Sequence, residues 1–187
     1  MQKTDQVRGR GPAPALLVAH LRAALAAAPD NRRGLRDRAI VLLQFAITGR
    51  EHEVAHLRLR DIVETEHGLE VDVRVSKISP RKVKVPFDSR PSTCLVRAWR
   101  AWTESAGLSD PDGFAFRALH WRWHTVMDAG LSPEAIGEVT TRLTARAEVS
   151  VRHTGHSPAG APPRSPGAPE TTARPSPSRV DGYPTAG

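Results

Sequence analysis

The composition of the chain changes abruptly after His156. Residues 157–187 contain half of the 16 prolines in the 187-residue sequence and no leucine, isoleucine, phenylalanine, methionine or tryptophan. Proline cannot continue a helix interior, and a segment without large apolar side chains cannot offset the entropy cost of its own ordering. We therefore expect 157–187 to be a disordered tail. The polar residues 1–14 are expected to be a flexible arm or linker, which leaves one folded domain over residues 15–156.

The chain is strongly basic, with a formal net charge of +7 and a sequence pI near 10.6. The positive excess comes mostly from arginine, whose planar guanidinium binds phosphate through paired hydrogen bonds. This charge balance favours nucleic acid as the partner. A gene rich in G and C would also enrich arginine, so charge alone leaves that alternative open.

The cysteine count and the hydropathy of the sequence indicate the cellular compartment of the protein. Cys94 is the only cysteine, which excludes an intramolecular disulfide and a cysteine-rich zinc module. No run approaches 18 apolar residues, and the first residues lack the apolar segment of a secretory signal. We expect a cytoplasmic protein that is neither secreted nor inserted in a membrane.

The spacing of apolar residues predicts an α+β fold. Helical periods indicate helices over about 15–28, 34–47 and 95–107, and another that starts at Ser132-Pro133. The segment 34–47 is apolar on all sides and is expected to form the core. Between these helices, an Arg60-Asp61 pair opens a strand, Val71, Val73 and Val75 alternate with polar residues, and Val83-Lys84-Val85 indicates a third strand. The prediction is a mostly helical domain with a small three-stranded antiparallel sheet.

Arg50 is the strongest candidate for a functional residue. It follows an apolar helix and Gly49, and precedes a short amphipathic turn, which places it at a helix boundary. A guanidinium there could clamp two phosphate oxygens and stabilise the charge that develops in phosphoryl transfer. The alternative is a structural arginine that caps helix carbonyls or pairs with Glu53.

The stretch from Phe45 to Ile62 resembles the start of the catalytic domain of tyrosine recombinases, the phage-integrase family. The positions that keep the family spacing are Arg50, Glu53, Val54, Leu57, Asp61 and Ile62, whereas Gly49 stands where the family has an apolar residue before the arginine. The resemblance covers about residues 15–157. It implies a recombinase-like fold and an Arg50 that grips the scissile phosphate.

The same resemblance assigns roles to further residues. Lys77 stands where the family keeps the lysine that protonates the leaving 5′ oxygen, and Arg81, Lys82 and Lys84 would help to hold the DNA backbone. A hairpin lysine that blunts an exposed sheet edge is the alternative for Lys77.

His156 is similar to the histidine of the family's His-x-x-Arg motif, but Ala159 occupies the arginine position. Tyr183, the only tyrosine, stands in a segment that faintly resembles the one carrying the family's nucleophile. A phenol can attack phosphate to form a covalent phosphotyrosyl link. However, the proline-rich surroundings provide no helix to position it.

The segment His120-Trp121-Arg122-Trp123-His124 offers two histidines spaced by four, as on one side of a helix. Without a third ligand or a nearby glutamate, surface packing is preferred to a metal site. Trp99 and Trp102 lie on the apolar face of a predicted helix and are expected in the core.

The resulting hypothesis is a truncated integrase-type recombinase, whose reading frame shifts just after His156, that binds double-stranded DNA and cleaves it little or not at all. A homo-oligomer on DNA would be possible, and no metal, cofactor or small-molecule ligand is expected. The alternatives are a basic DNA-binding or regulatory module that uses the recombinase scaffold for docking alone, and a poorly folding remnant.

Overall fold

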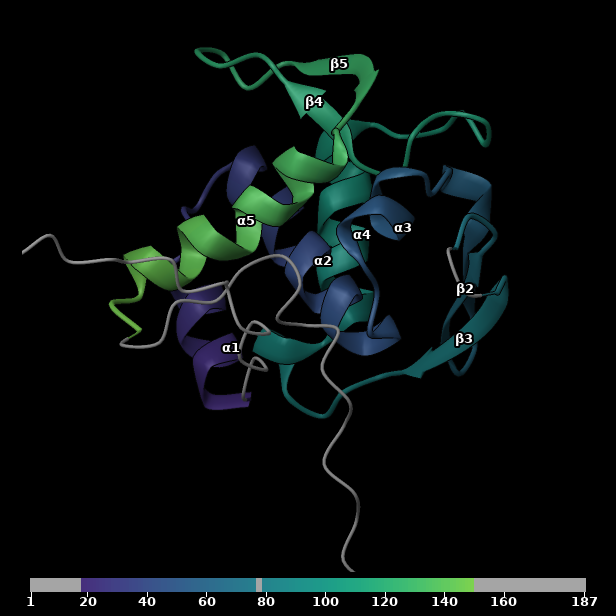
Figure 1. The fold of residues 1–187 in the computed structure, drawn as a ribbon, viewed down its shortest axis with the longest axis horizontal. Coiled ribbons are helices and arrows are strands. Elements are labelled where there is room, and N and C mark those ends of the chain that lie inside the picture. The colour runs from purple at the N-terminus through teal and green to yellow at the C-terminus, as the bar shows by residue number, and fades with distance from the viewer. Residues whose placement is uncertain (1–17, 77–78, 150–187) are drawn as a thin grey trace, which may run out of the picture.

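The computed structural model describes residues 18–76 and 79–149, and the predicted arm and tail lie outside this part of the chain (Figure 1). In chain order the elements are α1 (Val18–Ala26), α2 (Arg32–Ile47), α3 (Glu51–Ala55), the short 3-10 helix η1 (Leu59–Asp61), β1 (Ile62–Thr65), β2 (Gly68–Val73), β3 (Arg81–Pro86), the 3-10 helix η2 (Pro91–Thr93), α4 (Leu95–Ala106), β4 (Arg117–Leu119), β5 (Val126–Gly130) and α5 (Pro133–Arg146). Helices, a small sheet and helices again confirm the predicted α+β order.

Helix α2 is the centre of the helical layer and packs against both α4 and α5 (Figure 1). Its N-terminus is capped by Asn31, whose side chain accepts a hydrogen bond from the amide of Gly34. Ile40, Val41 and Leu43 point in different directions around the helix and are all buried. This confirms the prediction that an element apolar on all sides forms the core.

Helix α4 contributes both of the predicted core tryptophans. Trp99 and Trp102 are buried, and the Trp102 indole nitrogen donates a hydrogen bond to the carbonyl of Ala115 over 2.9 Å. The ring of Phe116 lies edge-on to Trp99, with 5.8 Å between the ring centroids. The indole hydrogen bond satisfies a polar group that burial would otherwise leave unpaired.

The sheet has the strand order β1-β2-β3 with antiparallel pairing throughout, as the alternating pattern predicted. Val71 of the central strand pairs with Ile62 on one side and Val83 on the other. The turn before β2 needs Gly68, which has φ +143° and whose Cβ, if present, would lie 2.0 Å from the carbonyl oxygen of Val85. Strand β2 ends at Val73, so Val75, which the alternation included, lies beyond it.

A second, two-stranded sheet was not predicted. β4 and β5 form an antiparallel hairpin that projects from the helical body (Figure 1). The segment His120–His124 is the loop of this hairpin, and His124 has a positive φ of 52°. The helical spacing considered for the two histidines is therefore wrong, because the residues between them form a turn.

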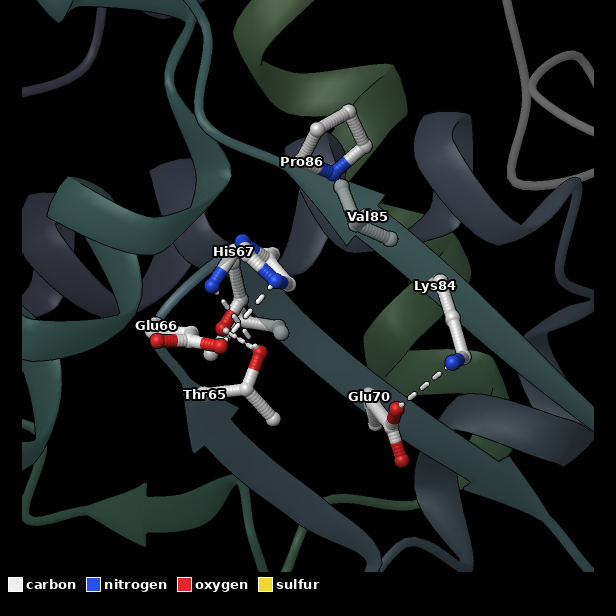
Figure 2. Close-up of a pocket in the computed structure, with 9 residues that line it drawn as sticks. Thr65, Glu66, His67, Glu70, Lys84, Val85 and Pro86 are labelled. Atoms are coloured by element: carbon white, nitrogen blue, oxygen red, sulfur yellow. Dashed lines mark hydrogen bonds and ion pairs between the residues drawn. The ribbon is translucent and has the colours of Figure 1, made fainter.

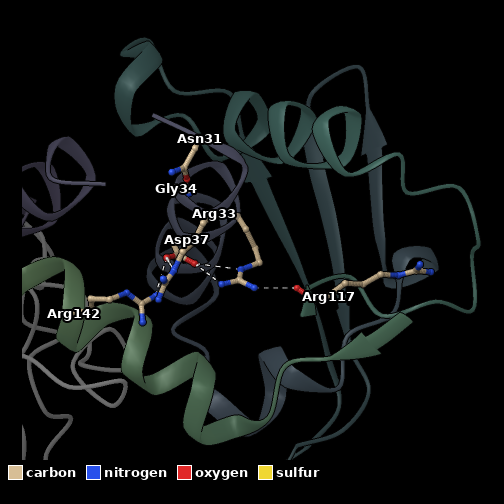
Figure 3. A network of polar contacts seen from close by, with 7 residues as sticks. Asn31, Arg33, Gly34, Asp37, Arg117 and Arg142 are labelled. Atoms are coloured by element: carbon tan, nitrogen blue, oxygen red, sulfur yellow. Dashed lines mark hydrogen bonds and ion pairs between the residues drawn. The ribbon is translucent and has the colours of Figure 1, made fainter. Parts of the chain in front are cut away.

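A buried carboxylate joins α5 and the β4–β5 hairpin to α2 (Figure 3). Asp37 is 1% exposed, and its side chain accepts hydrogen bonds from Arg142 of α5 over 2.7 Å and from Arg36 over 3.0 Å. Arg36 also donates to the carbonyl of Arg117 in β4 over 3.1 Å. Arg33 completes the cluster at 3.9 Å from Asp37. Because removal of the carboxylate would leave buried guanidinium charge unpaired, this cluster fixes how the last helix docks.

The described residues contain neither a membrane-spanning helix nor a cluster of metal-binding side chains. None of their helices has the length and hydropathy needed to cross a membrane. No group of three or more histidine, cysteine, aspartate or glutamate side chains in this part of the chain is arranged to hold a metal ion.

Candidate functional site

Arg50 lies in the corner between α2 and α3. Helix α2 ends with Thr48 in the left-handed conformation, with φ 47°, and the amide of Gly49 returns to the carbonyl of Gln44 over 2.9 Å. A Cβ on Gly49 would lie 2.7 Å from the Ile47 side chain, which would have to shift to admit the apolar residue of the family pattern. Glycine at this position lets the buried Ile47 side chain keep its place in the corner. The corner turns the chain so that Arg50 occupies the N-cap position before α3, with an exposed side chain.

Glu53 fixes the backbone of this corner. The side chain is 5% exposed, and its Oε2 accepts a hydrogen bond from the amide of Arg50 over 3.0 Å. Glutamate three residues after the first position is the spacing of a capping box, in which an acidic side chain satisfies a free amide at a helix start. Glu53 therefore holds the main chain of Arg50 and does not bind its guanidinium.

The same carboxylate binds both ends of the β2–β3 connection. Arg81 donates to Oε1 and Oε2 of Glu53, each over 2.9 Å, and Ser76 donates its hydroxyl to Oε1 over 2.7 Å. Arg81 also reaches the carbonyl of Ile47 over 3.2 Å. A paired guanidinium and carboxylate with two parallel hydrogen bonds is among the strongest polar contacts in proteins. Glu53 thus ties α2, α3 and the β2–β3 connection together.

The contact between Glu53 and Arg81 shifts the pKa values of both side chains. The hydrogen bonds from Arg81 lower the pKa of Glu53 to about 2, against the opposing effect of burial, and Ser76 and the Arg50 amide act in the same direction. The Glu53 carboxylate in turn raises the pKa of Arg81. Both groups are therefore charged at any physiological pH.

The guanidinium of Arg50 is left free. Among the described residues, no hydrogen bond, ion pair or ring contact of this side chain is found, and the side chain is exposed. The structural alternative, in which Arg50 pairs with Glu53, is wrong because Arg81 already occupies that carboxylate. Within the described part of the chain, the corner therefore presents an unpaired cation, Arg50, on a backbone fixed by a buried carboxylate.

The other residues predicted to act on DNA or to bind it lie either outside the described residues or on β3. Lys77, His156 and Tyr183 lie outside the described residues, so their predicted roles stay predictions. Arg81 was expected to hold DNA backbone, but its guanidinium is committed to Glu53. Lys82 and Lys84 are exposed on β3, and the Lys84 ammonium lies 3.2 Å from the carboxylate of Glu70. Only Lys82 of these three is exposed and has no partner within the described part of the chain.

A cavity of about 210 Å³ lies at the other end of the sheet, beside the turn between β1 and β2 (Figure 2). The ionisable residues on its walls lie beside one another: His67 lies 3.1 Å from Glu66, and the Lys84 ammonium lies 3.2 Å from Glu70. The lysine of this cavity is thus already paired with a carboxylate. The cavity is a weaker candidate for an anion site than the corner at Arg50.

The structural role of Glu53 is only partly visible in the sequence. The spacing from Arg50 to Glu53 matches a capping box, but the sequence gives no sign that Ser76 and Arg81 reach the same carboxylate. Those contacts span 23 and 28 positions and arise only when the sheet packs against the α2–α3 corner.

Comparison with known proteins agrees with the predicted family. No protein-family model matches the chain. In sequence, the chain is 28% identical over 83 residues to an integrase/recombinase XerD homologue of Selenomonas ruminantium, a match that covers 42% of this chain and 24% of that protein.

Three solved structures share the fold. XerA recombinase superposes with a TM-score of 0.58 at 19% identity, covering 79% of this chain and 48% of that one. A lambda integrase dimer bound to a COC′ core site superposes with a TM-score of 0.54 at 15% identity, covering 83% of this chain and 41% of that one. XerH recombinase bound to its difH substrate superposes with a TM-score of 0.53 at 11% identity, covering 85% of this chain and 44% of that one.

This chain therefore spans about a quarter of the curated relative, at 24%, and less than half of each of these three solved structures. At these identities the structural matches show the fold, and the XerD homologue supplies the relation in sequence. The chain is thus similar in sequence to an integrase/recombinase XerD homologue and in fold to XerA recombinase and lambda integrase, in agreement with the resemblance of the Phe45–Ile62 segment to tyrosine recombinases.

Proposed function

We propose that the described domain binds double-stranded DNA as a tyrosine-recombinase-type domain, with the guanidinium of Arg50 on a backbone phosphate. The observation that carries this proposal is the set of contacts made by Glu53. This buried carboxylate binds the Arg50 backbone and the Arg81 side chain, and leaves the Arg50 side chain exposed. An exposed, unpaired arginine on a fixed backbone suits bidentate binding of phosphate. The DNA-bound structures of lambda integrase and XerH, which share the fold, support the choice of partner.

Lys77 is proposed to act on the same phosphate as Arg50, as the acid that protonates the leaving oxygen. The support is the position of its neighbour in the chain. Ser76 donates to Oε1 of the carboxylate whose Oε2 accepts from the Arg50 amide, at 2.7 Å and 3.0 Å. Ser76, the residue before Lys77 in the sequence, therefore lies beside the Arg50 corner.

Strand cleavage is proposed to be weak or absent. His156 and Tyr183 are the candidates for the remaining phosphate-binding and nucleophilic groups, but Ala159 stands in the position of the second arginine of the motif. Removal of one electrostatic stabiliser of a developing oxyanion costs about 100- to 1,000-fold in rate. The same observation favours the second candidate function, a non-catalytic DNA-binding module.

A suicide DNA substrate separates the two functions. The full chain would be incubated with a nicked duplex that traps a covalent phosphotyrosyl product, and the mixture run on a denaturing gel. A slow covalent band that disappears in Tyr183→Phe would assign the nucleophile and the recombinase chemistry. Salt-sensitive binding that yields no adduct would support the docking module, and failure to bind duplex DNA at low salt would refute both.

Self-association on DNA is also proposed. The solved structures of lambda integrase include a dimer on a core site. Sedimentation of the full chain with and without duplex DNA would test this, and a monomer in both conditions would contradict it.

A further inference from the structure

The loop of the β4–β5 hairpin exposes two tryptophans. Trp121 is 79% exposed and Trp123 is 70% exposed, although an indole is one of the most costly side chains to leave in water. They differ in this from Trp99 and Trp102, which α4 buries in the core. Two exposed indoles on a projecting hairpin mark a surface for interaction.

The loop that carries these indoles is ordered by its own hydrogen bonds. The amide of His120 donates to the carbonyl of Thr125 over 2.9 Å, and the amide of His124 donates to the carbonyl of His120 over 3.0 Å. Nδ1 of His120 accepts from the amides of Arg122 and Trp123, each over 3.3 Å. A loop held in this way loses little conformational entropy when its side chains bind a partner.

The helical body anchors the far side of the loop. Arg32, the first residue of α2, donates to the carbonyl of His124 over 3.2 Å, and its Nε donates to the hydroxyl of Ser105 in α4 over 3.3 Å. These bonds connect the hairpin to α2 and α4. The exposed indoles are therefore presented by the fold at a fixed place.

Arg122 supplies positive charge beside the indoles. Its guanidinium carbon lies 5.0 Å from the centroid of the Trp123 ring, and residues 119–126 include no acidic residue. Aromatic faces next to a guanidinium are the chemistry that binds single-stranded nucleic acids, since bases stack on the rings and arginine contacts phosphate.

We propose that the loop of the β4–β5 hairpin binds unpaired nucleotides, with Trp121 and Trp123 stacked on bases and Arg122 on the backbone. In a duplex the faces of the bases are covered by their neighbours, so a ring that stacks requires a base that is already unpaired or displaced. This inference extends the proposed function to a second DNA element, and it stands on contacts separate from those at Arg50.

The test is a fluorescence anisotropy titration of the full-length chain with labelled single-stranded oligo(dT). Trp121→Ala and Trp123→Ala are each expected to weaken binding roughly 5- to 100-fold. Trp121→Phe is expected to keep most of the affinity because it keeps an aromatic face, whereas Trp121→Leu should bind as weakly as the alanine variant. Met127→Ala changes another exposed apolar residue of the same hairpin and should bind like the unaltered protein.

Thermal midpoints equal to that of the unaltered protein confirm that the exposed substitutions leave the core intact. Unchanged oligo(dT) affinity in both alanine variants, or full affinity in Trp121→Leu, would overturn the proposal. Tryptophan-dependent binding to phosphatidylserine vesicles without binding to oligo(dT) would also overturn it, and would identify a membrane surface instead.

A duplex titration of the same variants separates this inference from the proposed function. Weaker duplex binding in Arg50→Ala, together with weaker oligo(dT) binding in the tryptophan variants alone, supports both. Absence of duplex binding in every protein refutes the proposed function, while the oligo(dT) series still decides the role of the hairpin.

Discussion

Replacement of Glu53 by glutamine removes a charge from the most connected polar group at the α2–α3 corner. The carboxylate accepts two hydrogen bonds from Arg81, one from Ser76 and one from the amide of Arg50. Glutamine keeps the size of the side chain but replaces one acceptor oxygen with an NH2 group that faces these donors. The substitution therefore leaves the Arg81 guanidinium without its counter-charge.

The pKa of Glu53 and the cost of breaking a buried ion pair give similar values for the free energy of unfolding lost in Glu53→Gln. The pKa of Glu53 is about 2 in the folded protein against an ordinary 4.5, a difference worth about 3–4 kcal/mol at ~1.4 kcal/mol per pKa unit. Breaking a buried ion pair costs about 3–5 kcal/mol, and the 31% exposure of Arg81 favours the lower end because water can solvate the freed guanidinium. We expect Glu53→Gln to lower the free energy of unfolding by about 3 kcal/mol.

Urea unfolding followed by tryptophan fluorescence measures this loss. The matched control is Glu70→Gln, which breaks the exposed pair with Lys84 in the same sheet and should cost less than about 1 kcal/mol. The double variant Glu53→Gln with Arg81→Gln is expected to recover part of the loss, because no unpaired guanidinium remains. A Glu53→Gln protein as stable as Glu70→Gln would refute the central position given to this carboxylate.

Three further predictions concern stability. Because the folded pKa of Glu53 lies below its ordinary 4.5, its contribution to the free energy of unfolding is complete above about pH 4.5 and is lost as the pH falls towards 2. The free energy of unfolding in urea should therefore fall less steeply with acid in Glu53→Gln than in the unaltered protein, and an equal fall would contradict this. Gly49→Ala places a Cβ 2.7 Å from the Ile47 side chain and should cost about 1–3 kcal/mol by thermal unfolding, whereas an unchanged midpoint would show that the corner can relax. Ser132→Ala removes the cap on the Ala135 amide at the start of α5 and should cost about 1 kcal/mol, while Ser132→Gly should cost only a few tenths; equal losses would argue against the capping bond.

Local patterns in the sequence were sufficient for much of the fold. The all-round apolar character of α2, the alternation in β2 and the Ser132-Pro133 start of α5 each express a preference of a short segment, and the structure confirms them. The position of Arg50 at a helix boundary was predictable for the same reason, since Gly49 ends one apolar period and a second begins after it.

Contacts between distant segments were not predictable in this way. The joining of Asp37 to Arg142 spans 105 positions, and no local pattern indicates that one carboxylate will face three arginines. The β4–β5 hairpin was missed because its strands are short and its loop carries histidines at helical spacing. The free state of Arg50 likewise depends on Arg81, which reaches Glu53 only after the sheet has packed.

Salt dependence of duplex DNA binding by Arg50→Ala tests the central claim most directly. If the free guanidinium of Arg50 binds one backbone phosphate, the slope of log affinity against log salt should fall in magnitude by about 0.9 relative to the unaltered protein. Arg100→Ala removes the same charge from an arginine already paired with Glu64 and should leave the slope unchanged. An Arg50→Ala slope equal to that of the unaltered protein would contradict the account.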